Sequence, residues 1–262
     1  MSVGVVFSAS DGLLVIVDGQ MSEKSPDAPN GRKVIETDRR KVAFAPDEAA
    51  VVVVLTGQAT MCEIEAWRWV EIYLEEVRDD NVSGDLRTPR EVARAASRVI
   101  GRAVQQDNEN RRAKGKHTND GVDAFVAGFA AAPEDRQAFG EVWVFSSNEE
   151  GDHSPRAEPG FGDDTYGRPL GALPERAPFR DPDDDGYGRL PADAIYDRFG
   201  ATTASLRSMP LREVRELVET TMRDLVQEEA TVLLRGGVGG TWTLIELRPG
   251  VAPVCDRLEW GP

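Results

Sequence analysis

Cysteine and histidine are scarce in this sequence, and their scarcity excludes several kinds of chemistry. The 262 residues contain two cysteines, Cys62 and Cys255, and two histidines, His117 and His153. Two isolated cysteines supply neither a disulfide framework nor a paired-cysteine zinc site, and we expect each to be a small buried or interface side chain. Neither histidine lies near a Gly-x-Ser-x-Gly turn, so a Ser-His-Asp triad is not indicated.

Long apolar runs and an excess of basic residues are also missing. No stretch is apolar over the ~20 residues that a membrane-spanning helix needs, and no basic region followed by a long apolar segment opens the sequence. The 46 acidic residues outnumber the 31 basic ones, for a formal net charge of −15, which disfavours a nucleic-acid surface. We expect a soluble, cytoplasmic protein that binds neither membrane nor nucleic acid and needs no cofactor.

The start of the chain offers a catalytic group. Ser2 follows the initiator methionine and is small enough for methionine aminopeptidase to expose it, and a strand-like run begins at Val3. The α-amino group of an exposed serine has an ordinary pKa of roughly 8 and can act as general base toward the hydroxyl of the same residue. Because very many cytosolic proteins begin Met-Ser, this start also fits a protein without catalysis.

The first apolar hairpin ends at a carboxylate. The runs 3–7 and 13–17 are joined by Asp11-Gly12, which is typical of a β-hairpin turn. Asp18 follows the second run directly. Its side chain is therefore expected beside the start of the first strand.

A second apolar hairpin has a lysine at its entrance. Residues 40–44 lead through the turn 46–48 into the run 51–57, and a long helical pattern follows. Lys41 stands at the entrance, and Gly57 ends the run.

These features together resemble a proteasome-type β-subunit of the N-terminal-nucleophile hydrolase superfamily. Residues 17–22, Val-Asp-Gly-Gln-Met-Ser, are especially similar to the corresponding segment of the bacterial ATP-dependent two-component peptidase with a proteasome fold. In that family an N-terminal threonine is the nucleophile, an aspartate follows on the second strand, and a lysine stands at the start of a later strand. The resemblance places Ser2, Asp18 and Lys41 at these positions.

Two lysines compete for the third position. Lys41 fits if the segment 23–38 carries a short insertion. Lys33 gives the competing alignment, and we favour Lys41.

The resemblance also implies a role for each residue. The α-amino group would accept the proton of the Ser2 hydroxyl, and the lysine would lower the effective pKa of this nucleophilic unit by its positive charge. Asp18 would keep the lysine charged and oriented. The backbone N–H of Gly57 resembles the family's oxyanion donor.

The later half of the chain departs from the family's pattern. Proteasome subunits support the terminal amine with a Gly-Ser-Gly turn and an Asp-x-x-Ser-Gly-Gly segment, and the nearest equivalents here begin at Gly200 and Arg235. Arg235 and Val238 stand where the family has the aspartate and the second serine. Either Thr202 or Thr203 takes over part of the supporting role, or the site is impaired.

The predicted fold is α+β, a four-layer αββα sandwich of two packed, mainly antiparallel sheets, as the resemblance implies. We expect one domain over residues 1–262, with an acidic, Gly/Pro-rich loop insertion at 146–193 that acts as a lid or partner contact or has no fixed structure. The elements expected after the second hairpin are helices at 58–77, 89–112 and 211–228, strands at 122–130 and 141–145, and a glycine turn and strand at 238–247.

The insertion contains one motif that resembles a metal site. Residues 181–186, Asp-Pro-Asp-Asp-Asp-Gly, resemble the opening of a Ca²⁺-binding loop. The twelfth position, which should supply a bidentate glutamate, is Ala192. We interpret the segment as a solvated acidic loop and expect no metal site.

Two functional hypotheses follow. In the first, the protein is an amide hydrolase, a peptidase, that uses Ser2 after removal of Met1 to cleave a peptide or amide substrate. It would work in a homo-oligomeric ring or dimer built through the helices at 58–78 and 89–112, with an ATPase or unfoldase as a candidate partner. In the second, the protein is a catalytically inactive proteasome-fold subunit that acts in assembly or binding.

Overall fold

The computed structural model describes thirteen segments of the chain, which fall into two compact units. The first unit comprises residues 1–40, 166–246 and 254–262, and the second comprises 41–165 and 247–253. Within the described segments, no helix combines the length and the apolar character needed to cross a membrane. The described residues are 4–25, 27, 32–45, 50–57, 60–79, 88–118, 121–129, 140–147, 155–157, 170–171, 194–195, 198–199 and 203–260.

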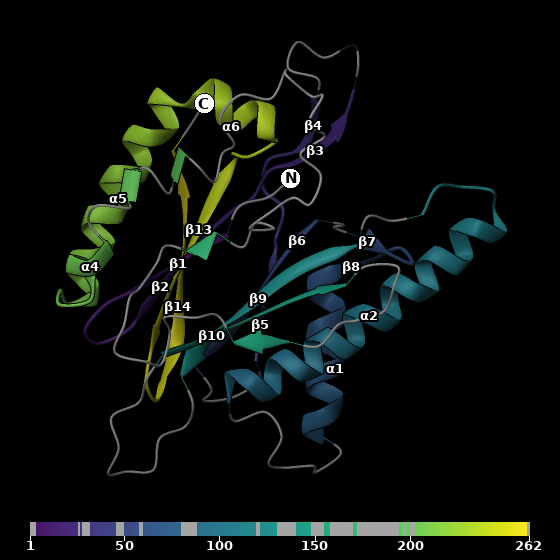
Figure 1. Cartoon of the computed structure of the whole chain (residues 1–262), viewed down its shortest axis with the longest axis horizontal. Coiled ribbons are helices and arrows are strands. Elements are labelled where there is room, and N and C mark those ends of the chain that lie inside the picture. The colour runs from purple at the N-terminus through teal and green to yellow at the C-terminus, as the bar shows by residue number, and fades with distance from the viewer. Residues whose placement is uncertain are drawn as a thin grey trace. The chain divides into compact units, whose positions relative to one another are not determined.

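Blocks of strands and blocks of helices follow one another along the chain (Figure 1). The helices are α1 (Ala66–Asp79), α2 (Pro89–Ala113), α4 (Thr203–Leu206), α5 (Leu211–Glu228) and α6 (Ala230–Gly236). The strands are β1 (Gly4–Ser8), β2 (Leu13–Asp18), β3 (Met21–Lys24), β4 (Arg32–Glu36), β5 (Val42–Phe44), β6 (Val51–Gly57), β7 (Thr60–Met61), β8 (Ile64–Glu65), β9 (Val122–Phe129), β10 (Gly140–Ser147), β11 (Arg156–Ala157), β12 (Leu170–Gly171), β13 (Thr241–Arg248) and β14 (Val251–Glu259).

Two sheets form the frame of the protein. One has the strand order β12-β1-β2-β13-β14 and the other the order β11-β10-β9-β6-β5. Short hairpins pair β3 with β4 and β7 with β8, and each pairing of known register is antiparallel. The α+β class with antiparallel sheets is therefore confirmed. Face-to-face packing of the two sheets and the single-domain organisation stay predictions.

The first hairpin forms as the sequence predicts. β1 and β2 pair with Gly4 opposite Val17, and the turn closes with a 2.9 Å hydrogen bond from the Ala9 N–H to the Gly12 carbonyl. The Asp11 carboxylate in this turn accepts the N–H of Leu211 at 2.6 Å. Because Pro210 at the N-cap offers no side-chain acceptor, Asp11 satisfies one of the open N–H groups at the start of α5.

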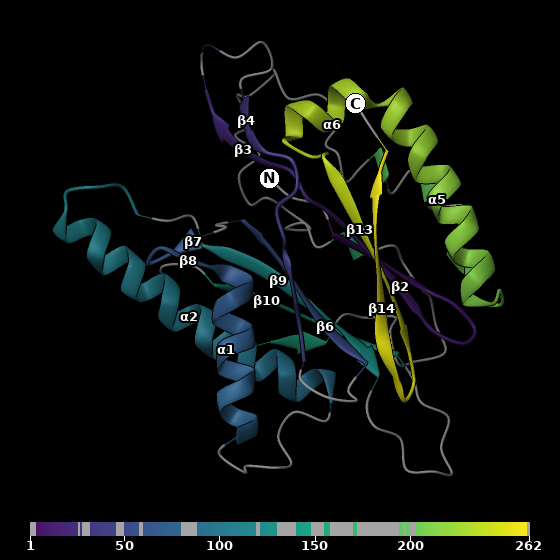
Figure 2. The same ribbon diagram turned by 180° about the vertical axis from the view of Figure 1, so that it is seen from behind.

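The first core lies between α5 and its sheet, and α5 runs along that sheet in both views (Figure 1, Figure 2). Apolar residues recur along α5 at helical spacing and meet the inward residues of β1 and β2, which alternate along each strand. Trp242 of β13 packs on Trp260 with ring centroids 5.4 Å apart. The α5 residues in this core are Leu211, Val214, Val218, Met222, Leu225 and Val226, and the strand residues are Val5, Phe7, Leu14, Ile16, Trp242 and Leu244.

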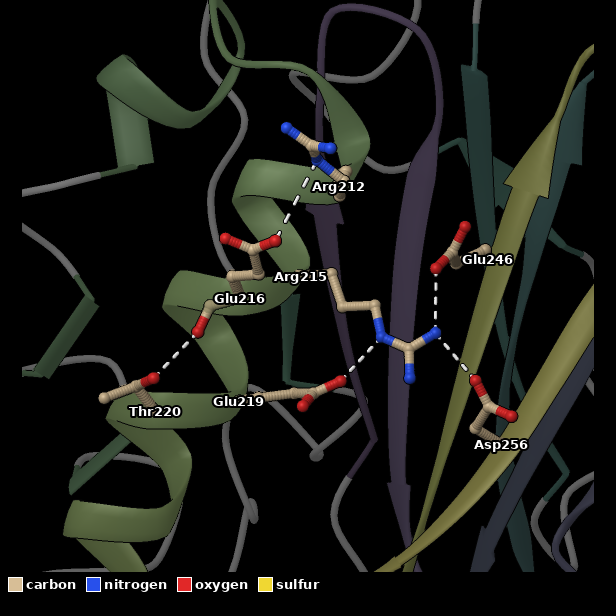
Figure 3. Close-up of polar contacts among 7 residues, drawn as sticks. All are labelled: Arg212, Arg215, Glu216, Glu219, Thr220, Glu246 and Asp256. Atoms are coloured by element: carbon tan, nitrogen blue, oxygen red, sulfur yellow. Dashed lines mark hydrogen bonds and ion pairs between the residues drawn. The ribbon is translucent and has the colours of Figure 1, made fainter.

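Arg215 links α5 to the last two strands of the first sheet (Figure 3). Its guanidinium lies 2.6 Å from Glu219, 2.9 Å from Glu246 on β13 and 2.7 Å from Asp256 on β14. A planar guanidinium offers several donors at fixed angles, so one side chain can bind carboxylates on three elements. The helix is thereby fixed to the sheet by polar contacts as well as by its apolar residues.

The second core packs α1 and α2 against β6, β9 and β10. α2 has strong start signals, because Thr88 and Glu91 form a capping box and Pro89 occupies the first turn. The residues that face the helices alternate along β6 and β9. They are Val51, Val53 and Leu55 on β6 and Val122, Ala124 and Val126 on β9.

The helix predicted at 58–77 begins later than expected. β7 and β8 form a hairpin before α1, and both turn residues, Cys62 and Glu63, have positive φ angles of 49° and 66°. The Asp107 carboxylate of α2 accepts the Cys62 N–H at 2.8 Å and stabilises this turn. Left-handed backbone at two consecutive residues ends any helix, and a contact 45 residues away in sequence is invisible to periodicity.

Several strands also differ from the prediction. The hairpin of β3 and β4 spans residues 21–36 and so overlaps the segment 23–38. β14 follows β13 at the edge of the first sheet, where polar residues obscure the strand pattern. The strand expected at 141–145 extends to Ser147. Two short edge strands lie inside the predicted 146–193 loop. β12 joins the first sheet, and β11 joins the second.

Candidate active site

Asp18 lies at the end of the first sheet where β1 begins. Gly4, the first described residue, stands opposite Val17, and Asp18 is the next residue along β2. Ser2 lies outside the described residues. The expected position of the carboxylate beside the start of the first strand is confirmed.

The Asp18 side chain is buried and faces a glycine turn. Only 1% of the residue is exposed, and the Gly239 N–H donates to its Oδ2 at 3.4 Å. This distance is near the upper limit for a hydrogen bond, so a small displacement of the turn would break it. A buried carboxylate depends on such donors, because removal of its charge from water is costly.

The glycine turn between α6 and β13 is packed against backbone. The Val238 N–H donates to the Leu233 carbonyl at 2.9 Å, and the Thr241 N–H donates to the Thr37 carbonyl at 2.7 Å. Gly240 has φ +73°, and a Cβ there would lie 2.2 Å from the Thr37 carbonyl oxygen. Glycine is therefore required at this position.

The chain after Asp18 is fixed by the same neighbours. A Cβ on Gly19 would lie 2.6 Å from the Thr241 carbonyl oxygen, and the Gly19 carbonyl accepts the Arg39 N–H at 2.7 Å. Gln20 is buried, with 3% of the residue exposed. Gln20 and Thr37 were not predicted to lie at the site. For Gln20 the sequence offered one signal of such a position, a polar residue directly after Asp-Gly at a strand end.

Lys41 and Gly57 lie at one end of the second sheet. The Lys41 carbonyl accepts the Leu55 N–H at 2.9 Å, two residues before Gly57 at the end of β6. Lys41 is buried, with 8% of the residue exposed. Gly57 has φ +87°, and a Cβ there would lie 2.8 Å from the Gly121 carbonyl oxygen, so this position also requires glycine.

Lys33 has different surroundings. It lies on β4, opposite Glu23 in the β3–β4 hairpin, and its side chain is exposed.

Asp18 belongs to the first unit, and Lys41 and Gly57 belong to the second. The catalytic assignment of these residues, and the choice between the two lysines, stay predictions.

The expected supporting residues are only partly described. Thr202 lies outside the described residues, and Thr203 begins α4. Val238 is buried in the first core, so an apolar side chain fills the position at which the resemblance places a serine.

The 181–186 segment lies outside the described residues. Within those residues, no group of three or more His, Cys, Asp or Glu side chains could hold a metal ion.

Both cysteines are free, and they differ in burial. Cys62 is half-buried, whereas Cys255 on β14 is exposed. Desolvation raises the pKa of both thiols, and the charges of Asp107 and Asp256 raise the pKa of Cys62 and Cys255 respectively. Neither is poised as a thiolate nucleophile.

The fold of the chain is similar to the folds of two solved structures over almost its whole length. The chain is similar to Anbu (ancestral beta-subunit) from Yersinia bercovieri, with 12% identity and a TM-score of 0.60 over 98% of this chain and 87% of that one. It is also similar to the Anbu (Gly-1) mutant from Hyphomicrobium sp. strain MC1, with 14% identity and a TM-score of 0.52 over 99% and 88% of the two chains. No protein-family model and no curated protein matches the sequence. At these identities the likeness shows the fold alone.

Proposed function

We propose that the protein is an N-terminal-serine amide hydrolase, a peptidase, in which Ser2 is the nucleophile after removal of Met1. The observation that carries this proposal is the burial of two ionisable residues, Asp18 and Lys41, at the strand ends where the resemblance expects catalytic groups. Buried ionisable side chains are costly to a fold and concentrate at functional sites. The exposed Lys33 offers no such indication.

The chemistry proposed is acyl transfer to the serine and then to water. Ser2 Oγ attacks the carbonyl carbon of the scissile amide, and the α-amino group accepts the hydroxyl proton. The C–N bond breaks, the α-amino group passes the proton to the leaving amine, and an acyl ester remains on Ser2. Water then attacks the ester, releases the carboxylic acid and restores the hydroxyl.

The other residues would act through charge and dipole. Lys41 would lower the effective pKa of the nucleophilic unit, and Asp18 would keep the lysine ammonium charged and oriented. The backbone N–H of Gly57 would donate to the oxyanion of the tetrahedral intermediate. The backbone at Gly57 has φ +87°, which glycine adopts readily and other residues disfavour, so the position requires the residue that the resemblance places there.

We also propose that the protein works as a homo-oligomer, a ring or a dimer, assembled through α1 and α2. The similar structures carry the name β-subunit, which supports assembly. Ile72 on α1 is a large apolar residue that is 38% exposed on the isolated chain. An ATPase or unfoldase is the candidate partner for a peptidase of this class.

One observation favours a second function. Val238 is apolar and buried at the position where the resemblance places a serine that supports the terminal amine. A protein that has lost this support fits the alternative of a catalytically inactive subunit in assembly or binding.

A peptide-library digestion separates the two functions. The wild-type protein, Ser2→Ala and Ser2→Thr would be incubated with a mixed peptide library, and new termini would be read by mass spectrometry. A peptidase yields cleavage with wild type and with Ser2→Thr, and none with Ser2→Ala. Absence of cleavage by all three proteins, or equal cleavage by wild type and Ser2→Ala, would favour the inactive subunit.

A further inference from the structure

We infer that Gln20 is a positioning residue, whose side-chain amide holds the glycine turn 238–240 so that the Gly239 N–H points at the Asp18 carboxylate. The catalytic consequence of this inference rests on the proposed function. The geometric part concerns only residues of the first unit and can be tested without activity.

The first support is the close approach of Gln20 to Gly239. The Gln20 Oε1 lies 2.9 Å, and its Cδ 3.7 Å, from the point where a Cβ on residue 239 would stand. Gly239 has φ +149°, a conformation that side chains disfavour. The amide of Gln20 therefore occupies the space that any other residue at position 239 would need.

The second support is that this contact completes the support of the turn. Leu233 holds the turn at Val238, and Thr37 holds it at Thr241, through hydrogen bonds to backbone carbonyls. Gly239 lies between these two anchors and carries the N–H that reaches Asp18. The Gln20 side chain packs on the turn at this middle residue, where its orientation decides whether the N–H meets the carboxylate.

The third support is the residue type. An apolar side chain of similar volume would fill this buried position without the cost of desolvating an amide. The 3.4 Å hydrogen bond from Gly239 to Asp18 is long and therefore sensitive to small shifts of the turn. A side chain that limits these shifts affects the Asp18 carboxylate without touching substrate.

The first test measures the Gly239 N–H directly, by NMR of protein labelled with ¹⁵N-glycine. Its resonance would be assigned by loss of a peak in Gly239→Ala. In Gln20→Met, which keeps the volume and removes the amide, we expect Gly239 to exchange its amide hydrogen about tenfold faster. Gly128, buried in the second unit, serves as the internal reference.

The matched control is Gln105→Met, because Gln105 is exposed on α2 and belongs to the second unit. This variant should leave the exchange of Gly239 unchanged. Unchanged exchange of Gly239 in Gln20→Met would overturn the inference. If Gln20→Met does not fold, Gln20→Asn keeps the amide but shortens the side chain, and it should give the same loss of protection.

The second test measures catalysis, as the rate at which a β-lactone acylates Ser2. We expect about a tenfold lower rate in Gln20→Met, with half-saturation by the lactone unchanged, and a rate within about twofold of wild type in Gln105→Met. If Gln20→Met is acylated at the wild-type rate, the positioning role is overturned. A wild-type protein that never labels would instead contradict the proposed function, and the exchange of Gly239 would still decide the contact of Gln20.

Discussion

Lys41 and Lys33 differ in burial, and this difference makes the choice of catalytic lysine testable. Lys41 is buried at the entrance to β5, whereas Lys33 is exposed on β4. Lys41→Met should lower the rate of Ser2 acylation by about a hundredfold or more, since a positioned proton-transfer or charge partner contributes at least this much. Lys33→Met should stay within about twofold of wild type. Rates would be measured by intact-protein mass spectrometry at fixed lactone concentration, and the reverse ranking would assign the role to Lys33.

The cysteines give a pH prediction at the same scale. Their pKa values are raised, mainly by desolvation, so both thiols stay protonated at neutral pH and become reactive only as the pH rises beyond the ordinary thiol value of about 8.5. Iodoacetamide should therefore modify Cys62 and Cys255 slowly at neutral pH and faster in alkaline buffer. Peptide mapping after timed alkylation checks this. Rapid alkylation of either cysteine at neutral pH would contradict it.

The sequence predicted some residues of the site and missed others for a physical reason. The position of Asp18 follows from strand alternation and a local turn, which are visible over a few residues. The contact of Asp18 with Gly239 joins positions 221 residues apart, and the roles of Gln20 and Thr37 depend on the same long-range packing. No local pattern records such a contact.

At the scale of elements, Arg215 fixes α5 to β13 and β14 (Figure 3). Arg215→Met would leave the three carboxylates without their cation, and two of them, Glu219 and Glu246, are largely buried. We expect a loss of about 2 kcal/mol in the free energy of unfolding and a fall in Tm of about 4–8 °C. The loss is smaller than for a fully buried ion pair because the side chains are partly exposed. Differential scanning fluorimetry measures the change.

Arg212→Met is the matched control on the same helix. Arg212 is 80% exposed and lies 3.9 Å from an exposed Glu216, so its loss should change stability by less than about 0.5 kcal/mol. Burial alone would lower the pKa of Arg215, but its hydrogen bonds to Glu246, Glu219 and Asp256 raise it above the unfolded value. The guanidinium therefore stays charged at neutral and mildly alkaline pH, where the carboxylates are ionised as well, and the deficit of Arg215→Met should be equal at both. A smaller deficit in Arg215→Met than in Arg212→Met would contradict this account of α5.

Periodicity predicted the long elements better than the short ones. α2 and α5 both carry a helical apolar pattern, α2 also carries start signals, and both helices lie where expected. The start of α1 was wrong because Asp107 stabilises a left-handed turn at Cys62 that the sequence pattern does not show. β14 was missed because an edge strand with few buried residues does not alternate.

At the scale of the whole molecule, the proposed assembly through α1 can be separated from folding. Ile72→Arg places a charge at an exposed apolar residue of α1 and should shift the oligomer toward the monomer mass of 28.7 kDa while each chain stays folded. Leu217→Arg is the matched control, because Leu217 is similarly exposed, at 36%, on α5. Size-exclusion chromatography with light scattering measures the mass. Equal masses for wild type and Ile72→Arg, or dissociation by Leu217→Arg alone, would contradict assembly through α1.

More of the architecture could be predicted than the low sequence identity to solved structures would suggest. The apolar runs of β1, β2, β6 and β9 and the glycine turn before β13 indicate the strands of the antiparallel sheets, although only 12% of residues match the similar Anbu structure. No periodicity specifies how the two sheets are arranged, and their face-to-face packing stays a prediction.

The central claim, that Ser2 is a working nucleophile, is tested most directly by the intact mass of the purified protein before and after a β-lactone or epoxyketone. We predict a mass without Met1 and one adduct per chain, located on Ser2 by fragmentation and absent from Ser2→Ala. A protein that retains Met1, or a free Ser2 that never labels, would contradict the claim and favour the inactive subunit.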